Sequence, residues 1–296
     1  MSDQEKIAIS APKNGNVPGP ALYIVGTPIG NLEDITFRAV RVLKGVEMVA
    51  CEDTRQTQKL LHHYGITTKT VSYHEHNEVT RAPELIMQLE QGATIALVTD
   101  AGMPAISDPG FRLISLAIRH HIPVVPIPGA SAFLASLVAS GMPTDSFRFS
   151  AFLPAKSGER RSALEKIREA ARTQIFYEAP HRIVETLEDI VDVLGAERHV
   201  VIAREVTKIH EEFLRGTAEQ VLLELKSRGE VKGEITLLIA KAELNHHPAV
   251  KPKDLRVRLQ EIMDADTVDE KAALKILAKE TGVSKSEVYR ELQRLK

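Results

Sequence analysis

The chain has 296 residues, of which 43 % are hydrophobic and 26 % charged, and its formal net charge is −2 at pH 7. This composition excludes a disordered protein and provides apolar material for two ordinary cores, or for one large core with an appendage. It also excludes a protein that binds polyanions over its whole surface, although a local basic patch is compatible with it.

The chain begins with a polar segment and contains a single cysteine. Residues 1–19 are rich in Gly, Pro and Asn and have no apolar stretch of the secretory kind, so we expect a disordered leader. No window reaches the roughly 18 consecutive apolar residues of a membrane span, so we expect a soluble protein. Cys51 ends the run Val46–Cys51, which predicts a buried strand. We interpret it as a core residue in a protein of a reducing, cytoplasmic compartment.

Strand-like runs alternate with amphipathic helical segments in the first part of the chain. This alternation predicts βαβ units on a parallel sheet, hence an α/β lobe over residues 20–126. The expected strands are 21–25, 46–50, 94–98 and 122–127, and the expected helices lie near 34–44, 54–63, 80–91 and 110–120.

The alternation begins again after Pro128, which predicts a second α/β lobe over residues 127–245 and a cleft between the lobes. A small-residue helix is expected at 130–140, followed by strands at 147–152, 173–177, 198–203 and 234–240. An extra segment at 211–216 and short connections predict that parallel and antiparallel strands are mixed in this lobe.

Residues 246–296 are expected to form a linker and a small helical module, because the strand signals stop there. Two capping-box patterns, Thr267-x-x-Glu270 and Ser284-x-x-Glu287, each precede an apolar helical face. With the turn expected at Gly282, they predict a pair of helices resembling a helix-turn-helix.

Three small-residue loops follow predicted strands of the first lobe. The loop 26–31 precedes a helix that we expect Asp34 to cap, and its spacing excludes a G-x-G-x-x-G fingerprint and a P-loop. The loop 126–132 directs the amides of a helix N-terminus into the cleft. Any one of these loops alone could be a tight turn, but together they predict a ligand pocket at the ends of the strands.

The loop 100–110 is the strongest sign of a small-molecule site, since seven of its eleven residues are Gly, Ala, Pro or Ser. Such side chains let the backbone approach a ligand closely, and the prolines limit the entropy lost in holding the loop. Asp100 adds a negative charge that would attract a sulfonium or an amino group. We interpret Asp108, which precedes Pro109, as a cap for the following helix rather than a chemical group.

Eight segments along the chain carry a shared pattern: 22–32, 51–55, 100–110, 128–132, 152–154, 176–182, 203–208 and 232–234. Together they resemble the ribosomal RNA small-subunit methyltransferase I branch of the tetrapyrrole methylase superfamily. The resemblance covers about residues 20–296. The sequence departs from the family's pattern at Thr99 and Met103, where Ser and Thr are expected. Met103 therefore lacks a hydroxyl that could bind a cofactor.

The resemblance implies a two-lobed fold, a homodimer, and S-adenosylmethionine bound between the lobes. It also implies 2′-O-methylation of a cytidine ribose in the decoding centre of 16S rRNA within the small ribosomal subunit. The residues predicted to bind the cofactor are Thr27, Pro28, Gly30, Asp100, Ala101, Gly102, Ile106, Ser131, Ala132, Tyr177, Gly233, Glu234 and Thr236.

A basic segment follows Pro154 and is the candidate RNA surface. Residues 156–172 carry six basic and three acidic side chains, a local positive charge suited to a phosphate backbone. The same pattern is equally typical of a solvated helix face with paired charges. The resemblance favours RNA binding by Lys156, Arg160 and Arg161, to which we add Arg182 at the cleft.

Asp100 and Glu178 are the predicted carboxylates near the reacting atoms. Methyl transfer from a sulfonium needs little acid or base help, since orientation supplies roughly 7 to 11 kcal/mol. We therefore expect a positional mechanism with no metal. The segment 74–78 has only two histidines and is interpreted as a polar rim. An ion pair between Glu178 and Arg182 that closes a turn is an almost equally good interpretation.

Two other functions fit the same residues. A methylase with this fold could act on a corrin or porphyrin precursor, although the basic segment and the helical module favour RNA. Alternatively, the module could bind nucleic acid in a regulator whose α/β lobes sense a ligand. Such a regulator would bind the cofactor without turnover.

Overall fold

The computed structural model describes residues 19–242, 257–263, 269–281, 288 and 290. Contacts divide the chain into two units, Met1–Lys241 and Ala242–Lys296, and each is described by itself. Residues 1–18 of the expected leader lie outside the described residues.

A five-stranded parallel sheet forms the first lobe, in the order β3-β2-β4-β1-β5. Its strands are β1 (Ala21–Val25), β2 (Met48–Cys51), β3 (Lys69–Ser72), β4 (Thr94–Leu97) and β5 (Val124–Ile127). The predicted parallel sheet is confirmed, and Cys51 is a buried free thiol in β2. The edge strand β3 was not predicted, because its four residues, KTVS, are only partly buried and give no clear apolar pattern.

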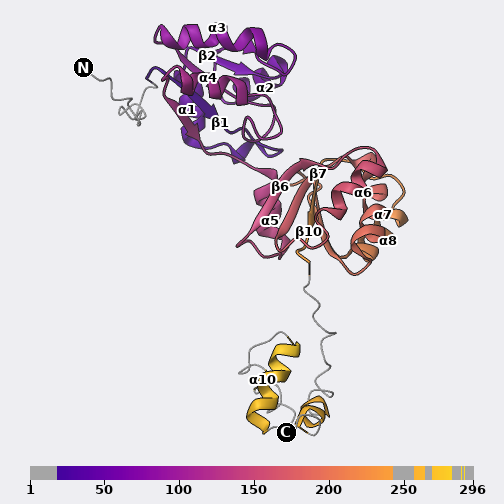
Figure 1. Ribbon diagram of the computed structural model, residues 1–296. Coiled ribbons are helices and arrows are strands. Elements are labelled where there is room, and N and C mark those ends of the chain that lie inside the picture. The colour runs from indigo at the N-terminus through magenta and orange to yellow at the C-terminus, as the bar shows by residue number, and fades with distance from the viewer. Residues whose placement is uncertain (1–18, 243–256, 264–268, 282–287, 289, 291–296) are drawn as a thin grey trace, which may run out of the picture. The chain divides into compact units, whose positions relative to one another are not determined.

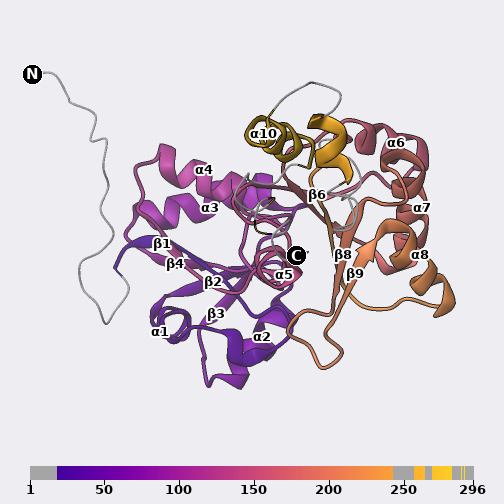
Figure 2. The same cartoon turned by 90° about the horizontal axis from the view of Figure 1, so that it is seen from below.

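Helices cover both faces of this sheet, which explains why β1 and β4 are buried along their whole length. Figure 2 shows α1 and α2 on one side and α3 and α4 on the other. Two apolar clusters, one on each side, hold these layers together. The helices are α1 (Phe37–Gly45), α2 (Thr54–His63), α3 (Glu78–Glu90) and α4 (Phe111–Arg119).

The predicted helix caps of this lobe are wrong. Thr36, not Asp34, caps α1, and its side chain accepts a hydrogen bond from the Ala39 amide. Asp34 lies in the preceding 3₁₀ turn η1 (Leu32–Asp34). The helix α4 begins after Gly110 without a side-chain cap, so Asp108 does not cap it.

The second lobe is built on a mixed sheet in the order β6-β7-β10-β8-β9. The pair β6/β7 is parallel and the other pairs are antiparallel, as the sequence predicted. Its strands are β6 (Phe147–Phe152), β7 (Thr173–Glu178), β8 (His199–Arg204), β9 (Glu212–Thr217) and β10 (Ile235–Ile239). The expected extra segment is therefore the strand β9.

Helices cover both faces of the mixed sheet (Figure 1). The helix α5 (Ala132–Ser140) packs through Leu137 against β7, β8 and β10. The opposite face carries α6 (Ser157–Glu165), α7 (Ile183–Leu194) and α8 (Ala218–Ser227), which share the largest apolar cluster of the lobe. A 3₁₀ turn, η2 (Pro180–Arg182), precedes α7.

The C-terminal unit contains helical residues 257–263 and α10 (Glu270–Thr281). Its own apolar cluster includes Ile262, Leu277 and Val288. Asp269 caps α10, since its carboxylate accepts a hydrogen bond of 2.7 Å from the Ala272 amide. The capping boxes at Thr267 and Ser284 begin outside the described residues, so the helix-turn-helix stays a prediction. Among the helices described, none is long and apolar enough to span a membrane.

Candidate active site

The loops after β1 and β4 are joined by a small backbone ladder. The Thr27 amide donates to the Gly102 carbonyl at 2.9 Å, and the Gly102 amide donates back at 3.1 Å. The buried Thr27 hydroxyl donates to the Thr99 carbonyl at 3.1 Å. Thr27 therefore holds the two loops together and does not present its side chain to a ligand.

The loops after β1 and β5 approach each other through two glycines. A Cβ atom built on Gly129 would lie 2.7 Å from the Gly26 Cα, and one on Gly26 would lie 2.7 Å from the Gly129 Cα. Real Cβ atoms do not come so close, so this backbone contact requires glycine at both positions. The three small-residue loops are thus fixed against one another, as their shared composition suggested.

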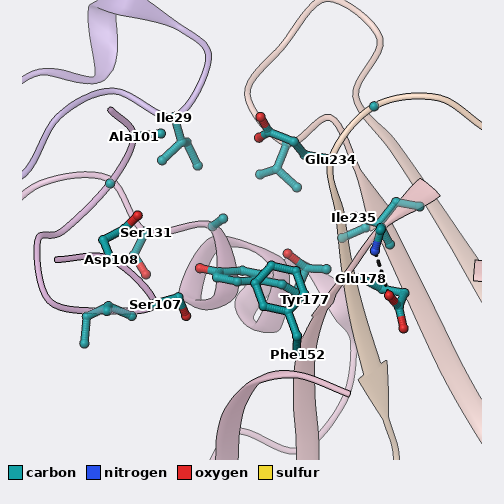
Figure 3. Close-up of a pocket in the computed structure, with 18 of the residues that line it drawn as sticks. Ile29, Ala101, Ser107, Asp108, Ser131, Phe152, Tyr177, Glu178, Glu234 and Ile235 are labelled. Atoms are coloured by element: carbon teal, nitrogen blue, oxygen red, sulfur yellow. Dashed lines mark hydrogen bonds between the residues drawn. The ribbon is translucent and has the colours of Figure 1, made fainter. Parts of the chain in front are cut away.

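These loops form one side of a cavity of about 370 Å³ whose other side comes from the second lobe. That volume lies within the range of about 300–1,000 Å³ of small-molecule sites. Figure 3 shows Asp108 and Ser131 on one side, Glu234 on the other, and the rings of Phe152 and Tyr177 between them. The lining is mainly apolar with a few convergent polar groups, as in cofactor pockets.

Most of the residues predicted to bind the cofactor line this cavity. They are Ala101, Gly102, Ile106, Ser131, Ala132, Tyr177, Gly233, Glu234 and Thr236. Four others do not line it: Thr27, Pro28, Gly30 and Asp100. Thr27 and Pro28 are buried behind the loop, and the exposed Asp100 accepts a hydrogen bond of 3.2 Å from the Asp53 amide.

Sequence reasoning missed several lining residues. They are Ile29, Met103, Ser107, Asp108, Phe152, Ala179, Pro180, Ala203, Val206 and Ile235. Phe152 and Val206 lie in the segments 152–154 and 203–208, which match the family's motifs, but nothing in these segments marks either residue as part of a cavity wall. Ser107 and Asp108 belong to the loop already singled out, and the small-residue pattern alone could have included them.

Asp108 lines the cavity with a carboxyl group whose pKa is shifted. Burial is the main cause that raises the pKa of Asp108 to about 6, and the nearby carboxylates of Glu52 and Asp100 raise it further against a hydrogen bond with Thr99. A carboxyl group with this pKa at a cavity wall can exchange a proton near neutral pH.

Two aromatic side chains form the floor of the cavity. The rings of Phe152 and Tyr177 lie with their centroids 5.8 Å apart, and Phe149 packs edge-on against Tyr177 at 5.0 Å. Burial raises the pKa of the Tyr177 hydroxyl, although a hydrogen bond with the Phe133 backbone opposes the shift. Tyr177 is therefore a neutral, hydrogen-bonding side chain over the functional pH range.

Glu178 contributes to the cavity wall, but its carboxylate is bonded to other groups of the protein. One of its oxygens accepts hydrogen bonds from the Arg182 guanidinium and the Ala179 amide, and the other accepts one of 2.9 Å from Thr186. The side chain is fully buried, and Figure 3 shows it turned away from the Tyr177 ring. This geometry matches the alternative interpretation, an ion pair that closes the turn after β7, and not a catalytic base.

The predicted basic surface divides into buried and exposed members. Arg160 is 1 % exposed, and its Nε donates to Asp189 at 2.6 Å, so the prediction that it contacts RNA is wrong. Lys156 is 84 % exposed. Arg161 is 43 % exposed and donates to Asp189 and Asp192. Arg182 is 14 % exposed and engages Glu178 together with the Leu153 carbonyl at 3.1 Å.

A turn after β8 packs against the loop that follows β1. Lys208 donates to Glu205 at 2.8 Å and to Glu234 at 3.2 Å, and its side chain lies against Gly30. The Thr207 hydroxyl accepts a hydrogen bond of 3.2 Å from the Asn31 amide. This turn explains why position 30 is glycine: the residue contacts Lys208, and it does not line the cavity.

Comparison with known proteins identifies this arrangement. Residues 21–222 match the family of tetrapyrrole (corrin/porphyrin) methylases. A relative from Halalkalibacterium halodurans, named ribosomal RNA small subunit methyltransferase I, is 49 % identical over 90 % of this chain and 93 % of its own length. The chain belongs to the tetrapyrrole methylase family.

Solved structures share the fold at low sequence identity. A diphthine synthase matches with a TM-score of 0.60 and 17 % identity, over 75 % of this chain and 90 % of its own. A uroporphyrin-III C-methyltransferase from Thermus thermophilus, complexed with S-adenosylhomocysteine, matches with a TM-score of 0.53 and 18 % identity, over 74 % and 97 %. The predicted two-lobed methylase fold is confirmed.

Proposed function

We propose that this methylase transfers the methyl group of S-adenosylmethionine to the 2′-hydroxyl of a cytidine ribose in the decoding centre of 16S rRNA. The observation that carries the proposal is the cavity of about 370 Å³ between loops that match the family's motifs, in a chain 49 % identical to a ribosomal RNA small subunit methyltransferase I. Its substrate would be the small ribosomal subunit.

The residues of the cavity fit S-adenosylmethionine. The small residues Ala101 and Gly102 leave room for a ligand at the cavity wall, the rings of Phe152 and Tyr177 offer faces to an adenine, and Asp108 and Glu234 offer carboxylates to cationic groups. The cofactor supplies an electrophilic methyl group. The protein holds the acceptor oxygen in line with that group, which accounts for the largest part of the expected rate enhancement.

The RNA surface of this proposal consists of Lys156 and Arg161, with Arg182 in the turn η2. The side chain of Lys156, at the start of α6, is 84 % exposed, and that of Arg161, within α6, is 43 % exposed.

We also propose a homodimer in the cytoplasm. Exposed apolar side chains on α5, Leu134 at 44 % and Val138 at 74 %, support an association of two copies.

The proposal is tested by incubating the purified chain with methyl-labelled S-adenosylmethionine and unmodified small ribosomal subunits. We expect one labelled ribose per subunit, recovered as a 2′-O-methylcytidine after nuclease digestion. Free rRNA and a porphyrin precursor serve as competing acceptors. Label in the porphyrin alone would show a tetrapyrrole methylase, and cofactor binding without transfer to any acceptor would indicate a regulator.

A further inference from the structure

A second cavity lies next to the cofactor cavity, on the first lobe. Its volume is about 570 Å³. It lies among the segment after β2, the residues that lead into α3, the end of the loop 100–110, and α4. The side chains that give it chemical character are Glu52, Glu75, Glu78, Phe111, Arg112 and Arg119.

The two cavities share one wall, made of Ser107 and Asp108. The backbone there is strained, because Ala105 and Ser107 both have φ of 66°, a conformation that costs a non-glycine residue of order 1–3 kcal/mol. Such strain persists where the surrounding structure holds a segment in a required position. The carboxyl group of Asp108 is half-buried at this wall (Figure 3).

The second cavity has the groups that recognise an unstacked nucleotide. Carboxylates such as Glu75 accept hydrogen bonds from an exocyclic base amine, and exposed aromatic rings stack on a base. Phe111 is 75 % exposed at the start of α4. Arg112, which also pairs with Glu78 at 3.5 Å, brings a guanidinium that can bind a phosphate.

Resting on the proposed function, we propose that the second cavity receives the acceptor nucleoside and that Asp108 accepts the proton of the attacking ribose hydroxyl. A nucleoside in the second cavity would lie beside Ser107 and Asp108, which also line the cofactor cavity. Asp108 therefore borders both cavities, whereas the carboxylate of Glu178 is bonded to Arg182, Ala179 and Thr186. This assignment replaces the expectation that Asp100 and Glu178 lie nearest the reacting atoms.

The proposed step balances without a further reactant. The hydroxyl oxygen forms a bond to the methyl carbon as its O–H bond breaks, and the proton passes to a carboxylate oxygen of Asp108. The carbon–sulfur bond breaks with its electron pair remaining on sulfur, which leaves a neutral thioether. Asp108 then releases the proton to solvent, which restores the carboxylate for the next cycle.

The surroundings of Asp108 suit this role. A base works best when its pKa lies near the working pH, and that of Asp108 is raised to about 6 by burial and by neighbouring carboxylates. The charged and titratable groups around it are Glu52, Asp100, Glu75, Glu78, Arg112 and Arg119 on the first lobe, with Tyr177 and Glu234 from the second. A bound sulfonium adds a positive charge, which keeps Asp108 ionised at neutral pH.

The test compares Asp108→Asn with the wild-type chain, under saturating S-adenosylmethionine and small ribosomal subunits. We expect the single-turnover rate to fall by about 10²-fold to 10⁴-fold, because that is the usual contribution of a positioned base. Cofactor affinity, measured by calorimetry, should fall by no more than about tenfold, because the variant loses only the attraction between the Asp108 carboxylate and the cofactor's positive charge. Asp145→Asn is the matched control, since Asp145 is exposed and lines neither cavity.

The pH dependence gives a second measurement that does not require turnover. Because the pKa of folded Asp108 is raised from 3.8 to about 6, the folded chain holds this proton more tightly than the unfolded chain. The free energy of unfolding should therefore fall as pH rises from about 4 to about 6, and this component should be absent from Asp108→Asn. In a separate measurement, the wild-type methylation rate should rise with pH to a plateau, and the midpoint of the rise should lie at or below about pH 6.

The second cavity is tested by Phe111→Ala. We expect its KM for subunits to rise about tenfold or more through lost stacking, with unchanged cofactor affinity. The control Phe37→Ala, at a still more exposed phenylalanine of α1, should change neither value.

An Asp108→Asn rate within tenfold of the wild type, or a loss explained by weaker cofactor binding, would overturn the assignment of Asp108. An unchanged KM for Phe111→Ala would overturn the assignment of the cavity. Both leave the proposed function standing. A wild-type chain that binds cofactor but does not methylate subunits would overturn the proposed function itself.

Discussion

The carboxylate of Glu178 and the guanidinium of Arg182 illustrate how a residue at a cavity wall can be structural. Glu178→Gln replaces one accepting oxygen by an amide that cannot accept, so at least one of its three bonds is lost. We expect the free energy of unfolding to fall by about 1–3 kcal/mol. Urea titration measures that loss. The methylation rate per folded molecule should remain within about tenfold; a larger loss would restore a catalytic role to Glu178.

Neighbouring arginines on α6 should respond differently to the same substitution. Arg160→Ala leaves Asp189 buried without its main partner, which costs about 3–5 kcal/mol of stability. Arg161→Ala should cost less than about 1 kcal/mol, because its side chain is 43 % exposed, but it should weaken binding to subunits. Equal stabilities of the two variants would contradict this division.

The pH dependence of the Arg160→Ala cost follows from Asp189. Burial alone would raise the pKa of Asp189, but hydrogen bonds from Arg160, Ser157 and Arg161 outweigh it and hold the pKa below its ordinary value of 3.8. A lowered folded pKa stabilises the fold above pH 3.8, and this stabilisation is lost as the pH falls. The stability difference between the wild type and Arg160→Ala, measured by urea titration, should therefore shrink below about pH 4.

At the scale of elements, the sequence predicted features that depend on a short segment and missed features that depend on contacts between distant segments. Period and length identified most strands, and small-residue composition located the loops 26–31 and 100–110, because both signals are contained in short segments. Phe152 and Val206 reach the cavity only because the two lobes pack together. Arg160 and Arg161 are adjacent in the sequence, yet Arg160 is buried, because it donates to Asp189 on α7, 29 residues further along the chain. A charge pattern on one helix cannot reveal that difference.

The contact between the loops after β1 and β5 gives a prediction for these elements. Gly129→Ala places a Cβ 2.7 Å from the Gly26 Cα and 2.9 Å from its carbonyl oxygen, so the two backbones must separate. We expect the cofactor affinity to fall at least about tenfold, which is ~1.4 kcal/mol. Calorimetry measures the affinity, and circular dichroism checks that the chain remains folded.

Gly158→Ala is the matched control for Gly129→Ala. Nothing lies within 4 Å of a Cβ at this position of α6, so cofactor affinity should not change. Stability should rise by up to about 1 kcal/mol, since alanine favours helix over glycine. Unchanged cofactor affinity in Gly129→Ala would show that the loops need not touch to bind the ligand.

At the scale of the whole molecule, the two lobes of the first unit have complete cores of their own. Their apolar clusters are built from residues between Ala21 and Ile239, and the C-terminal unit has a separate cluster around Leu277. Domains with their own cores fold independently. The described residues that line the cofactor cavity, from Ile29 to Thr236, all belong to the first unit.

A chain that ends at Lys241 should therefore fold and bind S-adenosylmethionine with the affinity of the full chain. Calorimetry measures that affinity, and thermal unfolding should show one transition at the temperature of the main transition of the full chain. Loss of cofactor binding would mean that residues beyond 241 support the first unit. Methylation of subunits by the shortened chain then measures what the C-terminal unit contributes to substrate binding. The cavity and Asp108 are intact in both chains. A raised KM for subunits at unchanged cofactor affinity would therefore assign the C-terminal unit to docking of the subunit.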